Sequence, residues 1–285
     1  MTITAQTVKE LREKTGAGMM DCKKALVEVG GDMEKAVDWL RQKGMAKAAK
    51  KSGRVTSEGL VALAASDDGK HAALAALLCE TDFVARGDQF QILAASVAQT
   101  VLDKNPADHA ALETLVGDQL TRLIATVGEN VRLGKFARCS LKGDNELVGR
   151  YVHSNRKIGV LVHLVLGKAA NAGRTEVQDL AKNLAMQVAA ANPMSLDAAG
   201  LDRAAVARER EIYRQKALED GKPEAIVDKI ADGAVKKFQK EVCLLEQPYI
   251  RDDKKSVGDI VREAAKAVND TITVTEFARV QLGAE

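Results

Sequence analysis

Two segments of this 285-residue chain repeat the same order of predicted elements, and this repeat is the feature that most constrains the fold. The first segment has apolar, strand-like runs at 60–65 and 71–79 on either side of a polar turn at 66–69, and a helix at 90–101 follows. The second has such runs at 147–153 and 158–166, a turn at 154–157 and a helix at 177–188. Turn residues between two apolar runs are typical of a β-hairpin, and a hairpin needs a helix or further strand against it to be stable. A later strand, at 130–141 and at 241–250, is expected to complete each copy. The repeat therefore predicts an α+β fold with two related subdomains of antiparallel sheets and helices, at 55–142 and 143–285.

Residues 1–54 are predicted to form a separate module of three short helices that ends in a basic linker. Thr4 and Asp32 are suited to begin the first and third helices, and paired glycines follow each of the first two. Three helices in so short a segment resemble a ubiquitin-associated-type module, which binds hydrophobic patches on partner proteins. The segment 41–54 carries six Lys and Arg and no acid. We interpret it as a solvated helix end and linker, and an RNA-binding stripe is the alternative, although no aromatic residue is interleaved for base stacking.

A helical hairpin is predicted as an insertion in the second subdomain, at about 198–240. Gly221-Lys222-Pro223 separates two helical stretches, since Gly is suited to end one helix and Pro to begin the next. In the second stretch apolar residues recur every four positions, at Ile226, Ile230, Ala234 and Phe238. We expect this stripe to pack on the partner helix of the hairpin, and self-association through the hairpin is the alternative.

Composition and motif searches argue against several function classes. The chain has 42 basic and 40 acidic residues, and its net charge of +2 is too small for an extended nucleic-acid-binding surface. Its four Cys and four His show neither C-x-x-C nor H-E-x-x-H spacing, so we expect reduced thiols, no metal site and no cofactor. Phosphate-binding loops and nucleophile elbows are missing too, which predicts a protein that acts by contact and is not an enzyme. Without an apolar signal-peptide core in residues 1–14 or a run of about 20 apolar residues, a cytoplasmic protein is expected.

The most conspicuous candidate binding site is the polar turn Thr81-Asp82-Phe83-Val84, which directly follows the buried strand predicted at 71–79. The chain has only five Phe, so a Phe placed in a connection stands out. Phe83 could be a wedge or anchor offered to a partner, or it could cover the core at the end of the strand. Both interpretations remain open on these residues alone.

A second long motif, at 15–26, accompanies this turn, and shorter ones follow in order at 127–130, 151–153, 156–162, 221–223 and 247–249. Together, over nearly the whole chain, these motifs resemble the bacterial elongation factor Ts family. The resemblance implies a guanine nucleotide exchange factor of translation elongation. Such a protein binds elongation factor Tu with GDP, disturbs its Mg²⁺ site and promotes GDP release so that GTP can bind.

The resemblance also implies roles for particular residues. The turn residues Thr81, Asp82, Phe83 and Val84 would contact the partner and dislodge its Mg²⁺. Further partner contacts are implied for Met19, Met20, Lys23, Val127, Gly128, His153, Ile250 and Arg251. Many members continue past the last core strand into a C-terminal helix that grips the partner. Here a strand-like run at 271–282 is soon followed by Glu285, so the resemblance leaves open whether this chain makes that contact.

An RNA- or ribosome-associated scaffold is the alternative function. It would use the basic 41–54 segment and the helical hairpin. RNA binding weakens steeply as salt rises, whereas apolar docking through Met19, Met20 and Phe83 should change little, so salt dependence separates the two hypotheses. An enzyme comes third, since no motif favours it.

Overall fold

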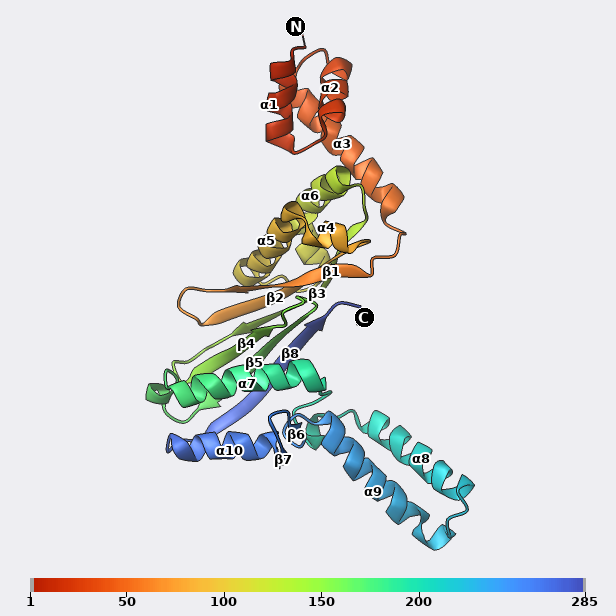
Figure 1. Cartoon of the computed structure of the whole chain (residues 1–285), viewed down its shortest axis with the longest axis vertical. Coiled ribbons are helices and arrows are strands. Elements are labelled where there is room, and N and C mark those ends of the chain that lie inside the picture. Colours follow the sequence, from red (N-terminus) through yellow and green to blue (C-terminus); the bar gives the residue numbers. More distant parts are fainter. Residues whose placement is uncertain (1–2, 284–285) are drawn as a thin grey trace.

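The computed structural model describes residues 3–283 and shows an elongated α+β molecule (Figure 1). A three-helix module lies at one end, two β-sheets with their helices form the middle, and a helical hairpin projects at the other end. The predicted fold class is confirmed. Within residues 3–283 no helix is long and apolar enough to cross a membrane. Glu285, on which the question of the C-terminal partner contact rests, lies outside the described residues.

The N-terminal module consists of α1 (Ala5–Thr15), α2 (Met19–Glu28) and α3 (Met33–Lys51). As predicted, the Thr4 and Asp32 side chains accept hydrogen bonds from backbone N–H groups of the first turns of α1 and α3. Gly16 ends α1 with a φ of 70°, a conformation that favours glycine. Small and apolar side chains from all three helices form its core, namely Val8, Leu11, Cys22, Ala25, Leu26 and Ala36.

The first sheet is antiparallel with the strand order β1-β2-β3. Its elements are β1 (Glu58–Ala65), β2 (His71–Cys79), α4 (Asp82–Arg86), α5 (Asp88–Lys104), α6 (His109–Val127) and β3 (Val131–Ser140). Apolar side chains of α5 and α6 pack against one face of this sheet and form the first large core cluster. The prediction did not include α6, and it described the start of α4 as a turn.

The second sheet repeats this arrangement with the strand order β4-β5-β8. The strands and helices of this half of the chain are β4 (Glu146–Val152), β5 (Ile158–Leu166), α7 (Thr175–Ala191), α8 (Arg203–Glu219), α9 (Glu224–Val242), β6 (Pro248–Tyr249), β7 (Asp252–Ser256), α10 (Val257–Ala267) and β8 (Ile272–Gln281). The short strands β6 and β7 pair with each other in a separate two-stranded sheet. Side chains of α7 and α10 cover one face and form the second large cluster. Each copy of the repeat thus contains a second helix, α6 or α10, before its last strand.

The strand that completes the second sheet was predicted wrongly. The segment 241–250 contains the end of α9, an irregular stretch and the two-residue strand β6, whereas β8 pairs with β5. Leu244 is fully buried in the core beneath the second sheet. The apolar residues that suggested a strand are therefore buried without pairing in the second sheet. A short apolar run has no periodicity that distinguishes a buried strand from another buried segment.

The two sheets pack face to face, so the middle of the molecule has the layers helix, sheet, sheet and helix (Figure 1). Alternate residues of β2 serve the two sides, since Leu77 belongs to the cluster under α5 and α6 whereas Leu74 and Leu78 lie between the sheets. A Cβ at Gly159 would lie 2.7 Å from side chains of Leu74 and Val61, so glycine allows close approach here. The cluster between the sheets draws on both halves of the chain, and the predicted boundaries at 54 and 142 stay a prediction.

The helical hairpin predicted at about 198–240 consists of α8 and α9, and it projects from the body (Figure 1). Gly221 has a φ of 72° between the helices and Pro223 immediately precedes α9. The predicted apolar stripe is wrong in one respect. Val227 and Ala231 are buried in the hairpin, whereas Ile226 and Ile230 are 43% and 36% exposed, because the buried face of α9 lies one residue further along.

Candidate functional site

The turn after β2 presents a single aromatic side chain to solvent. Thr81 begins α4, and its hydroxyl accepts a hydrogen bond from the Val84 N–H at 3.4 Å. Ala85 is buried and Val84 packs on the core, so this side of the short helix is anchored. Phe83 faces away and is 85% exposed. The interpretation of Phe83 as a core residue is therefore wrong.

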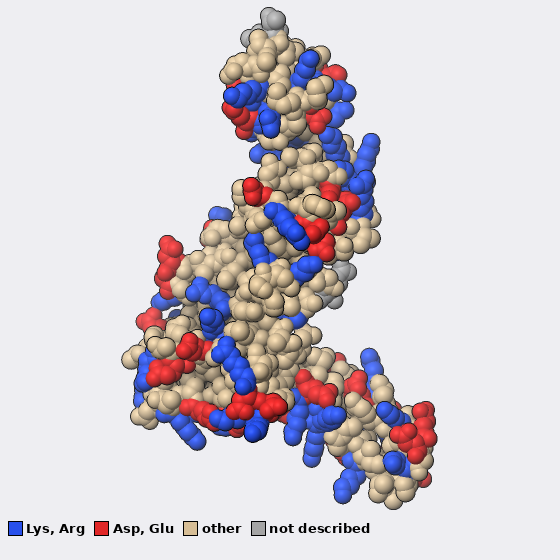
Figure 2. Space-filling model, viewed as in Figure 1, with Lys and Arg blue, Asp and Glu red and all other residues tan. Residues whose placement is uncertain are grey.

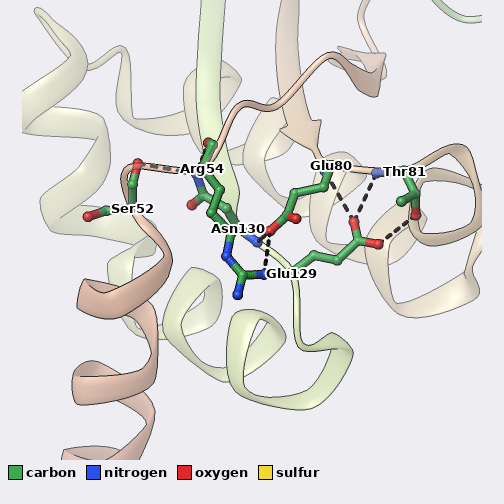
Figure 3. Close-up of polar contacts among 6 residues, drawn as sticks. All are labelled: Ser52, Arg54, Glu80, Thr81, Glu129 and Asn130. Atoms are coloured by element: carbon green, nitrogen blue, oxygen red, sulfur yellow. Dashed lines mark hydrogen bonds and ion pairs between the residues drawn. The ribbon is translucent and has the colours of Figure 1, made fainter.

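A carboxylate from a distant segment of the chain holds this turn in place (Figure 3). Glu129, in the connection from α6 to β3, accepts hydrogen bonds from the N–H groups of Glu80 (3.1 Å) and Thr81 (3.0 Å) through Oε2. Its Oε1 accepts a bond from the Thr81 hydroxyl at 2.6 Å. Hydrogen bonds to an ionised acceptor are stronger than neutral ones. The base of the Phe83 helix is therefore fixed to the end of α6.

Glu80 in turn binds the connection from α6 to β3 and the linker that follows the N-terminal module. Its Oε1 accepts a hydrogen bond from the Asn130 N–H at 2.6 Å and lies 3.4 Å from a guanidinium nitrogen of Arg54. The buried Asn130 amide donates to the carbonyls of Ser52 (3.3 Å) and Arg54 (2.9 Å). Three chain segments thus meet behind the Phe83 turn (Figure 3).

Other predicted contact residues lie near this junction. Val127 ends α6 and is partly buried against the core, and Gly128 follows it with a φ of 78°. His153 belongs to the turn between β4 and β5, whose neighbouring Asn155 lines a pocket of about 410 Å³ together with Asp82. The first subdomain and the tip of the second hairpin therefore approach each other beside the turn. Asp82 also forms an ion pair with Arg86 at 3.0 Å.

Met19, Met20 and Lys23 form a separate surface on α2 of the N-terminal module. Met19 is 43% exposed and Met20 76%, and Lys23 is exposed beside them. This end of the module contacts the first subdomain, since the Thr126 hydroxyl lies 3.4 Å from the Gly16 carbonyl. The structure does not bring these residues next to Phe83, because α2 lies in the module at one end of the molecule and α4 lies beside the first sheet (Figure 1).

Ile250 and Arg251 lie in a third place, the turn between β6 and β7 at the base of the hairpin (Figure 1). A fully buried glutamine fixes this turn. The Gln187 amide oxygen accepts a hydrogen bond from the Ile250 N–H at 2.9 Å, and its nitrogen donates to the Pro248 carbonyl at 3.2 Å. Ile250 itself is 44% exposed. The predicted site residues therefore lie at three separate places on the molecule, and each place has an exposed apolar side chain, namely Phe83, Met20 or Ile250.

Known proteins are similar to this chain over nearly its whole length. The sequence model of the family described as Elongation factor TS matches residues 80–284. Elongation factor Ts of Desulfovibrio desulfuricans is 74% identical over 283 residues, covering 99% of each chain. Elongation factor Ts of Nitratidesulfovibrio vulgaris strain DP4 is 57% identical, over 99% of this chain and 96% of the relative, and that of Clostridium perfringens strain SM101 is 46% identical, over 99% and 93%. This chain belongs to the elongation factor Ts family.

As an elongation factor Ts family member, the chain is a translation elongation factor. A buried thiol lies next to the turn. Burial, with a further contribution from Glu129, raises the pKa of the nearby Cys79 thiol to about 12, so this thiol stays protonated and is not a nucleophile. The Cys79 Sγ instead donates to the Thr81 carbonyl at 3.2 Å.

Sequence reasoning missed the residues that hold the elongation factor Ts turn in place. Glu129 and Asn130 were noted only as members of the motif at 127–130, and Glu80 was not singled out. The available signal was weak: each is a polar residue at the end of an apolar run, which is also where ordinary solvated residues occur. Only the pairing of β2 with β3 brings the two segments together, since Cys79 lies opposite Val131.

Proposed function

We propose that this chain binds elongation factor Tu carrying GDP and promotes the release of GDP so that GTP can bind. The observation that carries the proposal is the 85% exposed Phe83 on a short helix whose base is hydrogen-bonded to Glu129. A large exposed aromatic side chain on a fixed support is suited to insertion into a partner, because little conformational entropy is lost on binding.

In this mechanism the four turn residues have different tasks. Phe83 inserts beside the loop that supports Mg²⁺ in the GTPase, while Thr81 and Val84 hold the short helix in position. Asp82 lies on the first turn next to Phe83, where its carboxylate can contact the partner. Mg²⁺ requires near-ideal octahedral geometry and bridges the nucleotide phosphates, so a small displacement of its supporting loop weakens GDP binding.

The separated surfaces give the complex several points of contact. Met19 and Met20 offer flexible apolar side chains, with Lys23 beside them, for docking on the nucleotide-binding domain of the partner. Val127, Gly128 and His153 would contact the partner around Phe83. Ile250 and Arg251 would add a further contact. The buried Gln187 already fixes the backbone of their turn, so little ordering is needed when a partner binds there. Contacts linked in one molecule reinforce each other when the geometry allows all of them to form.

Thermodynamic linkage constrains this function. If the chain lowers the affinity of the GTPase for GDP, then GDP lowers the affinity of the GTPase for the chain by the same factor. A ternary complex forms, GDP leaves, and incoming GTP displaces the exchange factor. No bond is made or broken, so the chain needs neither a cofactor nor a catalytic residue of its own. The cytoplasm, where elongation takes place, is its proposed location.

The basic 41–54 segment gives the RNA-scaffold alternative little support. Arg41 and Lys47 lie 2.8 Å from carboxylate oxygens of Asp118 and Asp21, and Arg54 pairs with Glu80. Positive and negative side chains are interspersed over the face seen in Figure 2. Charges already paired within the chain contribute less to phosphate binding.

Self-association through the hairpin stays a separate hypothesis. Ile212, Leu218, Ile226 and Ile230 are exposed apolar residues there. Sedimentation of the purified chain over a range of concentrations would detect it.

Release of fluorescent GDP from purified elongation factor Tu tests the proposal. The chain should accelerate release, and Phe83→Ala should reduce the acceleration about 30-fold or more, as expected for an aromatic anchor worth at least about 2 kcal/mol. Ile92→Ala, at a 69% exposed residue of α5, is the matched control and should leave exchange unchanged. Lack of acceleration by the unaltered chain rejects the function, whereas full activity of Phe83→Ala rejects only the role of that residue.

A further inference from the structure

Four polar side chains from both sheets gather between the two halves of the molecule. A sulfur of Cys139, a ring nitrogen of His163 and a carboxylate oxygen of Glu276 all lie within 4.8 Å of one another. Glu146 adjoins them, with Oε2 at 3.0 Å from Nε2 of His163. Cys139 comes from β3 of the first sheet, whereas the other three come from β4, β5 and β8 of the second.

The strand register places these groups together. His163 lies directly opposite Glu276 in the pairing of β5 with β8, and opposite Val148 in the pairing with β4. Cys139 belongs to the cluster between the sheets and is 5% exposed. The expectation of no metal site rested on the local spacing of Cys and His residues. Ligands carried by strands of different sheets leave no such spacing in a sequence.

From this cluster we infer a binding site for a divalent transition-metal ion of the zinc class, with Cys139, His163 and Glu276 as its ligands. Thiolate, imidazole and carboxylate together match the preference of zinc, whereas calcium and magnesium prefer oxygen alone. Ligand atoms of a tetrahedral zinc site lie roughly 3.3–3.7 Å apart. A shift of about 1 Å closes the present spacing, and the Glu276 side chain is 66% exposed and free to make it.

The surroundings of His163 match the second shell of known zinc sites. A histidine that binds zinc through one ring nitrogen normally donates its other N–H to a carboxylate, which orients the ring. Here Nε2 faces Glu146, which is itself held by the Lys142 N–H at 2.8 Å from the same oxygen. Nδ1 lies 3.9 Å from Oε1 of Glu276 and is the nitrogen left for the metal. The Thr275 hydroxyl, now 2.8 Å from Nδ1, can turn to the His163 carbonyl at 3.3 Å.

Two carboxylates face the same imidazole in this cluster. Glu146 lies 3.0 Å and Glu276 lies 3.9 Å from a ring nitrogen of His163, and Lys142 adds a positive charge beside Glu146. The Cys139 thiol must lose its proton before its sulfur can bind a metal. Metal binding releases that proton to solvent and forms the sulfur–metal bond. The ion would then join the first sheet to the second.

Cobalt titration of the chelator-treated, reduced chain tests this site. We expect one Co²⁺ per chain and a near-ultraviolet thiolate-to-cobalt absorption band that stoichiometric Zn²⁺ removes. Zn²⁺ should also raise the melting temperature, because it binds only the folded arrangement. Absence of the band, or a band that Zn²⁺ leaves unchanged, overturns the assignment.

Variants identify the ligands. Cys139→Ser and His163→Gln should each abolish the band, while Cys243→Ser, which removes another buried thiol, should keep it. Glu146→Gln should retain the band and weaken zinc binding about 10- to 100-fold, as expected for a second-shell partner. Circular dichroism checks that each variant is folded, and His163→Gln decides the test if Cys139→Ser unfolds. A band that survives in folded His163→Gln, or that disappears in Cys243→Ser, contradicts the proposed ligand set.

Discussion

Glu129→Ala is the perturbation that most directly examines how the structure supports nucleotide exchange. The substitution removes the acceptor of three hydrogen bonds, from the N–H groups of Glu80 and Thr81 and from the Thr81 hydroxyl. It leaves Phe83 and its exposed surface unchanged. Any loss of exchange activity would therefore come from a poorly positioned Phe83 and not from a missing contact.

The expected magnitude follows from these bonds. Hydrogen bonds to a charged acceptor contribute about 1.5–3 kcal/mol each, but Glu129 is only partly buried and water replaces some of what is lost. We expect a net loss of about 2 kcal/mol in the free energy that orders the turn. The fraction of molecules with Phe83 in place then falls by up to about 30-fold, and the efficiency of exchange falls with it.

A double-mutant cycle in the GDP-release assay separates positioning from direct contact. Glu129→Ala should slow exchange in the unaltered chain by about 10- to 30-fold. In a Phe83→Ala background the same substitution should slow exchange by less than about threefold, because the side chain that it positions is already gone. Chemical denaturation of each variant reports whether the whole fold is affected.

Additive effects of the two substitutions would refute the reasoning. Glu129 would then act on the partner directly, or through the general stability of the first subdomain. An unchanged exchange rate in Glu129→Ala would show that the short helix holds its position without the carboxylate. Rescue by Glu129→Gln should be partial, since an amide oxygen can accept the two N–H bonds while its nitrogen cannot accept the bond from the Thr81 hydroxyl.

Two further predictions concern stability. Gly149→Ala should lower the free energy of unfolding in urea by about 1–3 kcal/mol or more, since the new Cβ would lie 2.3 Å from the Ala181 carbonyl oxygen. Gly117→Ala is the control: its new Cβ meets nothing within 4 Å, so it should stabilise the chain by about 0.4–1 kcal/mol. Equal effects of the two substitutions would contradict the packing of α7 on β4. Hydrogen bonds from Ser256 lower the pKa of Asp259 to about 2 from its ordinary 3.8, so its contribution to stability is present above about pH 4 and lost as the pH falls towards 2. The melting temperature of Asp259→Asn should therefore be lower than that of the unaltered chain at pH 7, and this difference should shrink as the pH falls from about 4 to about 2. A difference that stays constant over these pH values would show that the charge of the Asp259 carboxylate does not stabilise the fold.

Features with a local physical cause were predicted well. Thr4 and Asp32 are caps because their side chains accept bonds from N–H groups within the next three residues. The strands β1 and β2 were found because a hairpin pairs neighbours in the chain. Local sequence did not decide whether the Phe83 side chain is exposed. Its sequence context suits a core residue and a surface wedge equally, and only the packing of Val84 and Ala85 turns Phe83 outwards.

The order of apolar and polar residues by itself determined the three-helix module, the two hairpins with their helices and the projecting insertion, because these depend on contacts between near neighbours in the chain. Only the tertiary structure decided which strand closes the second sheet, which carboxylate supports the Phe83 turn and that Cys139 approaches His163. Each of these depends on the register of strands far apart in sequence. Such a register is set by packing over the whole sheet and leaves no periodic trace in either segment.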